Sequence, residues 1–327
     1  MRITILGLCA MLTASLWSIQ SATAQQRWDL AAAYPAGNHH TQFLEAFAER
    51  VNERSVGAVT ITVHPNGSLF PGNQIKRAVQ TGQTDMGERL VSALGNENPI
   101  FEVDAVPFLA TSFDESWILY QITREYYQDI LAAQNIQYLY ALPWPPQGLF
   151  TATAVERAED MQGRRFRAYN VATSRIAELF QAQPTQIEAA ELSQALATGV
   201  VDSMFTSGAT GVDSKVWEQL DYYYDVRAWI PLNIVMINQR VWNGLDADTQ
   251  EILLDVAAEI EAEGWEHVRG MTAGLNATLA ENGMQVLEPS AALSEGLREM
   301  GEILTAEWIE RAGDTGQAII DAFQAAR

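Results

Sequence analysis

The sequence predicts an α/β fold in which helices cover both faces of a largely parallel sheet. Three observations carry this prediction. Segments with period-two alternation, such as 59–63, take turns with segments of helical spacing, such as 41–52. A proline-rich break interrupts this rhythm at 143–148, and the last third of the chain has helical periodicity. With 327 residues, 48% of them hydrophobic, the chain can form one large or two mid-sized domains.

The first half of the chain is expected to alternate strands with helices. The first strand ends at the turn Tyr34–Gly37, and the second ends at Pro65–Gly67. The segment 105–109 reads as a buried strand or turn. The remaining expectations, in chain order, are strands at 28–33, 59–63 and 137–142 and helices at 41–52, 73–81 and 116–134.

The segment Pro143–Gly148 (PWPPQG) is the strongest break in composition, and it suits either a crossover between domains or a rigid wall of a cleft. The alternation then resumes before a helical end. An acidic amphipathic helix is expected at 246–271, with Ile252, Leu253, Val256, Ile260, Trp265 and Val268 facing inward. The other elements expected here are strands at 164–168, 200–204 and 234–238 and helices at 173–181, 191–198, 272–282, 294–311 and 316–327.

The charge balance excludes several classes of partner. The chain has 41 acidic and 20 basic residues, a formal net charge of −21, and only two lysines, Lys76 and Lys215. Nucleic-acid binding needs a basic face that neutralises phosphates, and an anionic membrane surface needs the same. We therefore expect neither nucleic acid nor a membrane surface as partner.

The first 24 residues have the pattern of a secretory signal peptide. A basic start at Arg2 precedes a mostly apolar run over 3–19, and the small residues Ser21–Ala24 form an Ala-x-Ala cleavage site. A membrane anchor is the alternative, but the run is short and lacks a basic stop-transfer segment. Leu8 before Cys9 also disfavours lipidation. Cleavage removes Arg2 and Cys9, leaving a cysteine-free exported protein with a formal charge of −22.

Catalytic signatures are missing from the sequence. The four histidines, His39, His40, His64 and His267, form no H-x-x-x-H pair, and there is no G-x-S-x-G, G-x-G-x-x-G or G-x-x-x-x-G-K motif. The pair His39-His40 suits a solvated or helix-capping role better than a metal site. We therefore expect no enzyme activity, no metal ion and no cofactor, and an α/β enzyme ranks third among the functional interpretations.

Three arginines in one short strand offer recognition chemistry instead. Alternation places Arg165 and Arg167 on one face and Arg164 on the other. A guanidinium group suits a carboxylate because it donates two parallel N–H bonds. The alternative is a surface strand whose arginines form ion pairs.

Four stretches of the chain, one of which contains these arginines, resemble the solute-binding proteins of tripartite ATP-independent periplasmic (TRAP) transporters, the DctP-like family. The resemblance extends over essentially the whole chain after the signal peptide, and the last two stretches are the most specific. The stretches are Thr81–Met86 (TGQTDM, similar to "G-x-x-D-M"), Val106–Leu109 (VPFL, "lPfl"), Glu159–Arg167 (EDMQGRRFR, "eDlkGlkiR") and Ala195–Asp202 (ALATGVVD, "aLqtGvvDg").

The resemblance implies a two-lobed periplasmic-binding-protein fold, with a ligand cleft between α/β lobes and a helical C-terminal region. The lobes would close on the ligand around a hinge. We expect 25–147 plus about 232–271 in lobe I, and 148–231 plus about 272–327 in lobe II.

By the same resemblance, Arg167 occupies the position of the family's near-invariant arginine, which implies a bidentate grip on a ligand carboxylate. Tyr169 and Asn170 follow it into the cleft. Thr206, with Ser207 beside it, stands where the family commonly has an asparagine. Phe150 replaces a second arginine, which suggests an apolar wall instead of a second ionic anchor.

Further contacts are expected from both sides of the cleft, each with a structural alternative. Trp144 also suits packing at the lobe junction, and Phe205 also suits the core. The candidates are Trp144, Gln147, Phe205, Trp229 and Asn233 as walls, with Asn38, His39, Glu88 and Arg89 from loop ends of the first lobe.

Together these features predict a periplasmic solute-binding protein that captures a small organic acid and delivers it to the membrane subunits of a TRAP transporter. One arginine with an aromatic-rich rim favours a monocarboxylate with an apolar or aromatic body, such as an aromatic or 2-oxo acid, over a dicarboxylate or sugar acid. The alternative is a binding protein of an ATP-driven importer or of a sensor system. A monomer is the default expectation.

Overall fold

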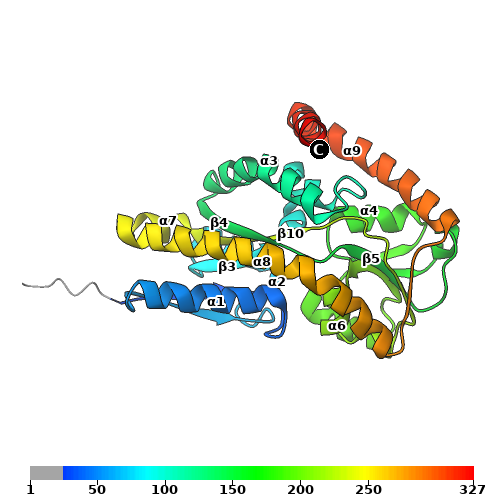
Figure 1. The fold of residues 1–327 in the computed structure, drawn as a ribbon, viewed down its shortest axis with the longest axis horizontal. Coiled ribbons are helices and arrows are strands. Elements are labelled where there is room, and N and C mark those ends of the chain that lie inside the picture. Colours follow the sequence, from blue (N-terminus) through cyan, green and yellow to red (C-terminus); the bar gives the residue numbers. More distant parts are fainter. Residues whose placement is uncertain (1–24) are drawn as a thin grey trace, which may run out of the picture.

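Two β-sheets form the framework of the molecule. The computed structural model describes residues 25–327, so the predicted signal peptide lies outside the described residues. We call the part built on the first sheet the first lobe and the part built on the second sheet the second lobe, and Figure 1 shows them side by side. Of the described helices, none is both long and apolar enough to span a bilayer.

The first sheet has the strand order β2-β1-β3-β10-β4. Strand β1 pairs in parallel with β2 and β3, whereas β10 runs antiparallel to both β3 and β4. Helices α1 and α2 follow β1 and β2 in chain order, and α3 precedes β4. The bounds are β1 Gln26–Ala31, α1 His39–Arg54, β2 Val59–His64, α2 Gly72–Thr81, β3 Met86–Leu90, α3 Phe113–Ala132, β4 Ile136–Pro143 and β10 Leu232–Asn238.

The second sheet has the order β11-β9-β5-β8-β6-β7. Strands β6, β7 and β8 are parallel neighbours, and β5 runs antiparallel to β8 and β9. Helices α4, α5 and α6 connect these strands. The bounds are β5 Gln147–Thr151, β6 Arg165–Ala168, α4 Val171–Leu179, β7 Gln183–Gln186, α5 Leu192–Ala197, β8 Ser203–Ser207, α6 Gly208–Asp213, β9 Tyr222–Tyr224 and β11 Gln285–Leu287.

Both sheets are mixed, although a largely parallel sheet was expected from the sequence. The antiparallel members lie where the chain passes between the lobes. Strand β4 ends at Pro143 and β5 begins at Gln147, so the proline-rich break is the crossover. The returning chain lies beside it, because Trp144 N–H donates to Pro231 O at 2.8 Å and Gln147 N–H donates to Trp229 O at 2.9 Å.

Helix α8 (Ala247–Glu281) is continuous, whereas the sequence predicts a break near 271. No proline interrupts this stretch, and the helix packs on α1 and β4 in the first lobe and on α6 and β11 in the second. The short helix α7 (Gln239–Asn243) precedes it. Figure 1 shows α8 running from α7 past the strands to α6.

Helix α9 (Ala291–Ala326) also contacts both lobes. It bends at Gly313, whose φ of 60° lies in a region that favours glycine, between the two helices that the sequence predicts. Before the bend, Leu297 and Leu304 enter a core of the second lobe. Trp308 and Phe323 enter the core of the first lobe.

Candidate functional site

A cavity of about 40 Å³ lies between the two lobes. Such a volume holds several water molecules, since one needs about 10–15 Å³. Several lining residues, such as Leu90, Trp144 and Tyr169, lie at the carboxyl end of a strand or directly after it, and in open α/β sheets ligands bind beyond the carboxyl ends of strands. The lining residues are Tyr34, Arg89, Leu90, Trp144, Gln147, Arg167, Tyr169, Glu188, Ala189, Thr206, Thr210 and Pro231.

Arg167 is the central cation of this cavity. Strand β6 carries it inward, and its side chain is only 3% exposed. Its Nε donates to Ile187 O at 3.1 Å, and its Cζ lies 4.9 Å from the ring centre of Tyr169. Within residues 25–327, no carboxylate lies within ion-pair distance of its guanidinium group. Burial lowers its pKa, but an arginine stays charged in a protein.

The neighbouring arginines are engaged elsewhere. Arg164 Nε donates to Asp160 O at 2.8 Å, and Arg165 Nε lies 2.9 Å from Asp202 Oδ2. Arg165 therefore fits the surface ion-pair alternative that the sequence left open, whereas Arg164 donates to backbone carbonyl groups. Arg167 alone of the three faces the cavity.

A second cavity-lining arginine, Arg89, comes from the end of β3 and is 6% exposed. Its two terminal nitrogens donate to the two carboxylate oxygens of Glu188, at 3.0 and 3.2 Å. Glu188 belongs to the second lobe, just after β7. This fork-to-fork ion pair therefore joins the two lobes at the cavity.

Aromatic rings also line the cavity. Trp144, 4% exposed, meets Tyr34 edge to face at 4.7 Å between ring centres. Its indole Nε1–H donates to Asn233 Oδ1 at 2.8 Å, which fixes the plane of the ring. Tyr169 O–H donates to Gln147 Oε1 at 3.2 Å, and Gln147 Nε2 donates to Pro145 O at 2.9 Å.

Behind Trp144 lies a buried polar cluster. Asn233 Nδ2 donates to Glu88 Oε1 at 2.6 Å, and His40 Nδ1 lies 3.4 Å from the same oxygen. Burial raises the pKa of Glu88 to about 7 and lowers the pKa of His40 well below its usual value. Glu88 and Asn233 thus support the wall and do not line the cavity.

Asn38 and His39 lie at the start of α1 and do not line the cavity. Asn38 Oδ1 accepts from His40 N–H at 2.9 Å as the helix cap, and its Nδ2 donates to Asp213 Oδ2 at 2.6 Å in the second lobe. His39 Nε2 lies 3.4 Å from Pro143 O. Burial lowers the pKa of His39 to about 3, so the ring is neutral. The solvated or capping role expected for His39 and His40 is wrong, because both side chains are buried and Asn38 caps the helix.

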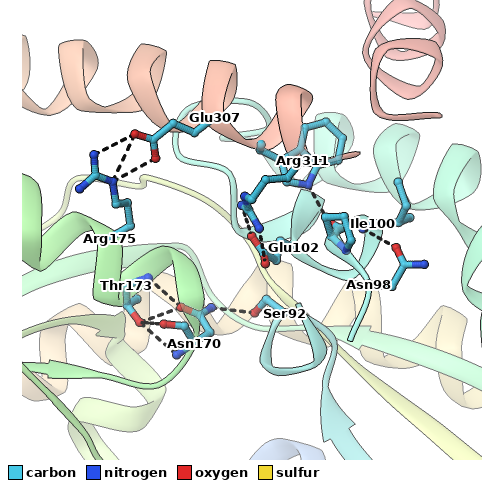
Figure 2. Close-up of polar contacts among 11 residues, drawn as sticks. Ser92, Asn98, Ile100, Glu102, Asn170, Thr173, Arg175, Glu307 and Arg311 are labelled. Carbon is cyan, nitrogen blue, oxygen red and sulfur yellow. Dashed lines mark hydrogen bonds and ion pairs between the residues drawn. The ribbon is translucent and has the colours of Figure 1, made fainter. Parts of the chain in front are cut away.

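Asn170 and Ser207 also act as helix caps. Asn170 Oδ1 accepts from Thr173 N–H at 2.8 Å at the start of α4, and its Nδ2 donates to Ser92 Oγ at 2.9 Å across the lobes, as Figure 2 shows. Ser207 Oγ accepts from Thr210 N–H at 3.2 Å at the start of α6. Asn170 lines an open groove next to the cavity.

Three aromatic candidates lie in the cores of the second lobe. Phe150 packs 4.4 Å from Tyr223 between ring centres, and Phe205 packs 5.4 Å from Trp229. All three candidates, Phe150, Phe205 and Trp229, are at most 1% exposed. The structure thus brings Arg89, Trp144, Gln147, Arg167, Tyr169 and Thr206 together at the cavity.

Sequence reasoning missed other lining residues, chiefly Glu188, Tyr34, Leu90, Pro231 and Thr210. Tyr34 was identified only as part of a turn. Glu188 follows β7, a strand that contains Pro184 and reads as a loop. Within residues 25–327, no group of three or more His, Cys, Asp or Glu side chains is placed to hold a metal ion.

Comparison with known proteins identifies a protein family whose model matches this chain and solved structures that are similar to it. The model of the bacterial extracellular solute-binding proteins, family 7 (DctP), matches residues 30–311. DctP6 of Bordetella pertussis, an extracytoplasmic solute receptor that binds pyroglutamic acid, is 42% identical, with a TM-score of 0.90 over 92% of this chain and 100% of its own. A marine metagenome TRAP solute-binding protein, solved with co-purified pyroglutamate, is 41% identical, with a TM-score of 0.91 over 92% and 99%.

A more distant relative is the ectoine-binding periplasmic protein TeaA of Halomonas elongata, 22% identical over 97% of this chain and 94% of its own. The relatives confirm the resemblance seen in the sequence and do not favour an ATP-driven importer or a sensor. The chain belongs to the DctP family of bacterial extracellular solute-binding proteins, the receptors that bind small organic acids for TRAP transporters.

Proposed function

We propose that this protein captures pyroglutamate, or a closely similar cyclic monocarboxylate, for uptake by a TRAP transporter. The observation that carries the proposal is Arg167, a buried guanidinium that faces an interlobe cavity without a carboxylate of its own among the described residues. Two receptors more than 40% identical to this chain bind pyroglutamate. Pyroglutamate agrees with the sequence-based preference for a monocarboxylate. It belongs to neither of the two classes named there as examples, since it is not an aromatic acid and not a 2-oxo acid.

The cavity has groups that suit each part of such a ligand. Arg167 supplies two N–H donors for the carboxylate, and the exclusion of water strengthens that ion pair. Trp144 and Tyr34 offer flat apolar surfaces to a compact ring. The hydroxyls of Thr206 and Thr210 can both donate to the lactam C=O and accept from the lactam N–H.

The remaining sequence-based expectations complete the proposal. Residues 1–24 direct export to the periplasm and are cleaved, and the protein then acts as a monomer without catalysis, cofactor, metal ion or nucleic acid. Lobe I comprises 25–147 plus about 232–271, and lobe II comprises 148–231 plus about 272–327. The lobes close on the ligand, and the membrane subunits recognise the closed form.

Titration calorimetry of the purified protein with L-pyroglutamate tests this proposal. We expect tight binding of pyroglutamate and much weaker binding of L-proline, which lacks the lactam carbonyl, and of succinate. The protein is unfolded in denaturant and refolded before the titration, because a co-purified ligand would occupy the site and mask binding. Tight binding of succinate or a uronate with no response to pyroglutamate would contradict the ligand assignment.

The variant Arg167→Ala tests the anchor. We expect it to lower pyroglutamate affinity by at least about 100-fold and to remove ligand-induced thermal stabilisation, because loss of one partner of a buried ion pair costs roughly 2–5 kcal/mol. Arg165→Ala, two residues earlier on the same strand and paired with Asp202, is the matched control and should bind like the wild type. Unchanged affinity in Arg167→Ala removes this residue from the site.

A further inference from the structure

Three charged side chains line the cavity: Arg89, Arg167 and Glu188. The bidentate pair neutralises the charge of Arg89, because each of its two terminal nitrogens donates to one carboxylate oxygen of Glu188. Arg167 has no carboxylate partner among residues 25–327. The lining of the cavity therefore carries one net positive charge, and that charge lies on Arg167.

The pair between Arg89 and Glu188 joins the two lobes between the cavity and a neighbouring groove. Both residues, with Tyr169, line the cavity on one side and an open groove of about 1060 Å³ on the other. The pair also lies against Gly72, where a Cβ atom would come within 2.7 Å of Glu188 Oε2 and 2.8 Å of Arg89 Nη1. Because Gly72 has no side chain, the backbone of α2 can pack directly against the ion pair.

Other ionisable groups near the pair do not change this charge balance at the lining. Glu88, next to Arg89 in the sequence, points to Asn233 and His40 and is 1% exposed. Tyr34 and Tyr169 line the cavity, and burial raises the pKa of both phenols, so they are neutral. The acidic and basic groups that remain at the cavity are the three named above.

We propose that Glu188 determines specificity by neutralising Arg89, so that the cavity accepts a monoanion and rejects a dianion of similar shape. The inference rests on the proposed function and deepens it by naming the residue that sets the preference for a single negative charge. A monoanion neutralises Arg167 and leaves no net charge in the cavity. A dianion leaves one buried negative charge without a partner, and an unpaired buried charge is strongly unfavourable.

The variant Glu188→Gln tests this directly, because it keeps the size of the side chain and releases Arg89. The probes are glutaramate and glutarate, which have nearly the same shape and differ by one negative charge. We expect the wild type to prefer glutaramate, and we expect Glu188→Gln to raise the ratio of glutarate affinity to glutaramate affinity by about tenfold or more. Calorimetry at fixed ionic strength gives both affinities.

A double variant separates charge from structure. In Arg89→Gln with Glu188→Gln, the net charge of the lining returns to one, so the preference for the monoanion should return. The control Glu191→Gln removes an exposed acid from the same segment, which lines the groove and not the cavity, and should leave the ratio unchanged. Circular dichroism establishes that each variant is folded.

Two results overturn the inference: an unchanged ratio in a folded Glu188→Gln protein, or a double variant that retains the shifted preference. Arg89→Gln alone provides a further measurement, because an unpaired Glu188 should weaken binding of both probes by about tenfold. These outcomes are distinct from failure of the proposed ligand. If the wild-type protein does not bind pyroglutamate but shows the expected affinity ratio and its change in Glu188→Gln, this inference stands and only the assignment of pyroglutamate as ligand fails.

Discussion

The environment of each arginine decides its role at this site. Strand alternation places Arg165 and Arg167 on one face, yet Arg165 is half exposed and paired with Asp202, whereas Arg167 is 3% exposed and faces the cavity. The difference arises from what packs above the strand end, where Tyr169 and Ile187 enclose Arg167. Sequence alone identified the arginine cluster, and the resemblance selected Arg167 within it.

The carboxyl group of Glu88 makes the free energy of unfolding depend on pH. Burial raises its pKa from 4.5 to about 7, so folding favours the neutral carboxyl. The contribution of this group is therefore fully present below pH 4.5 and is lost as the pH rises through 7. A shift of this size corresponds to roughly 3 kcal/mol, given about 1.36 kcal/mol for each pKa unit.

The variant Glu88→Gln removes this dependence, since the amide stays neutral and still accepts from Asn233. We expect the stability of the wild type, relative to the variant, to fall between pH 4.5 and 7 and to level off above that. Urea unfolding at a series of pH values measures it. Glu53→Gln, an exposed acid on α1, is the control, and parallel pH profiles for wild type and Glu88→Gln would contradict the prediction.

Helices α8 and α9 contact both lobes. The sequence predicted which α8 residues face inward better than it predicted where the two helices begin and end. The inward residues Leu253, Val256 and Ile260 are fully buried, as their spacing indicates. Continuity of α8 past 271 arises from contacts with α6 and β11, which periodicity cannot reveal. In α9, a bend at Gly313 joins the two predicted helices. Leu297 and Leu304 pack in a core of the second lobe, and the residues from Trp308 onward pack in the core of the first lobe.

Close packing of α8 on β4 makes Gly264 a sensitive position. A Cβ atom there would come within 2.4 Å of Leu142 Cδ2, and Leu142 is itself 2% exposed and cannot move into solvent. We expect Gly264→Ala to lower the free energy of unfolding by roughly 1–3 kcal/mol, the usual range for overpacking.

Gly270→Ala is the matched control on the same helix, since nothing lies within 4 Å of its added Cβ atom. We expect it to raise stability by about 0.5–1 kcal/mol through helix propensity. Urea unfolding of both variants provides the comparison. If the two substitutions had equal effects, the packing of α8 on β4 would differ from the one described.

Much of the fold follows from local pattern, and much of the site does not. Long elements such as α3 and β4 were predicted because their periodicity extends over many residues. The short strands β7 and β9 were missed because three or four residues carry little pattern and Pro184 reads as a loop. Glu188 was missed for a different reason, because its role depends on a contact with Arg89, which is 99 residues away in the sequence.

Two of the few basic residues of this acidic protein are buried at the interlobe cavity. In a chain with a formal net charge of −21, Arg89 and Arg167 are buried at the interlobe cavity. Glu188 neutralises Arg89, and exposed charges more than about 10 Å away are screened at moderate salt, so Arg167 dominates the potential that a ligand meets. Acidity of the outer surface and capture of an anion are therefore compatible.

Polar contacts across the lobes surround the cavity. Asn38 Nδ2 donates to Asp213 Oδ2 at 2.6 Å, Asn170 Nδ2 donates to Ser92 Oγ at 2.9 Å, and Arg89 pairs with Glu188. Only the last pair lines the cavity. The Ser92 contact can therefore report on closure without touching the ligand.

We expect Ser92→Ala to weaken pyroglutamate binding about fivefold, because one hydrogen bond contributes about 1 kcal/mol to the closed state and apparent affinity scales with the population of that state. The loss should appear in calorimetry, and X-ray scattering of the unliganded variant should show a larger radius of gyration than the wild type. Thr305→Ala, which removes a hydroxyl bonded only within α9, is the control. Wild-type affinity and dimensions in Ser92→Ala would show that this contact does not hold the lobes together, whereas a loss of affinity with unchanged dimensions would assign Ser92 to the ligand itself.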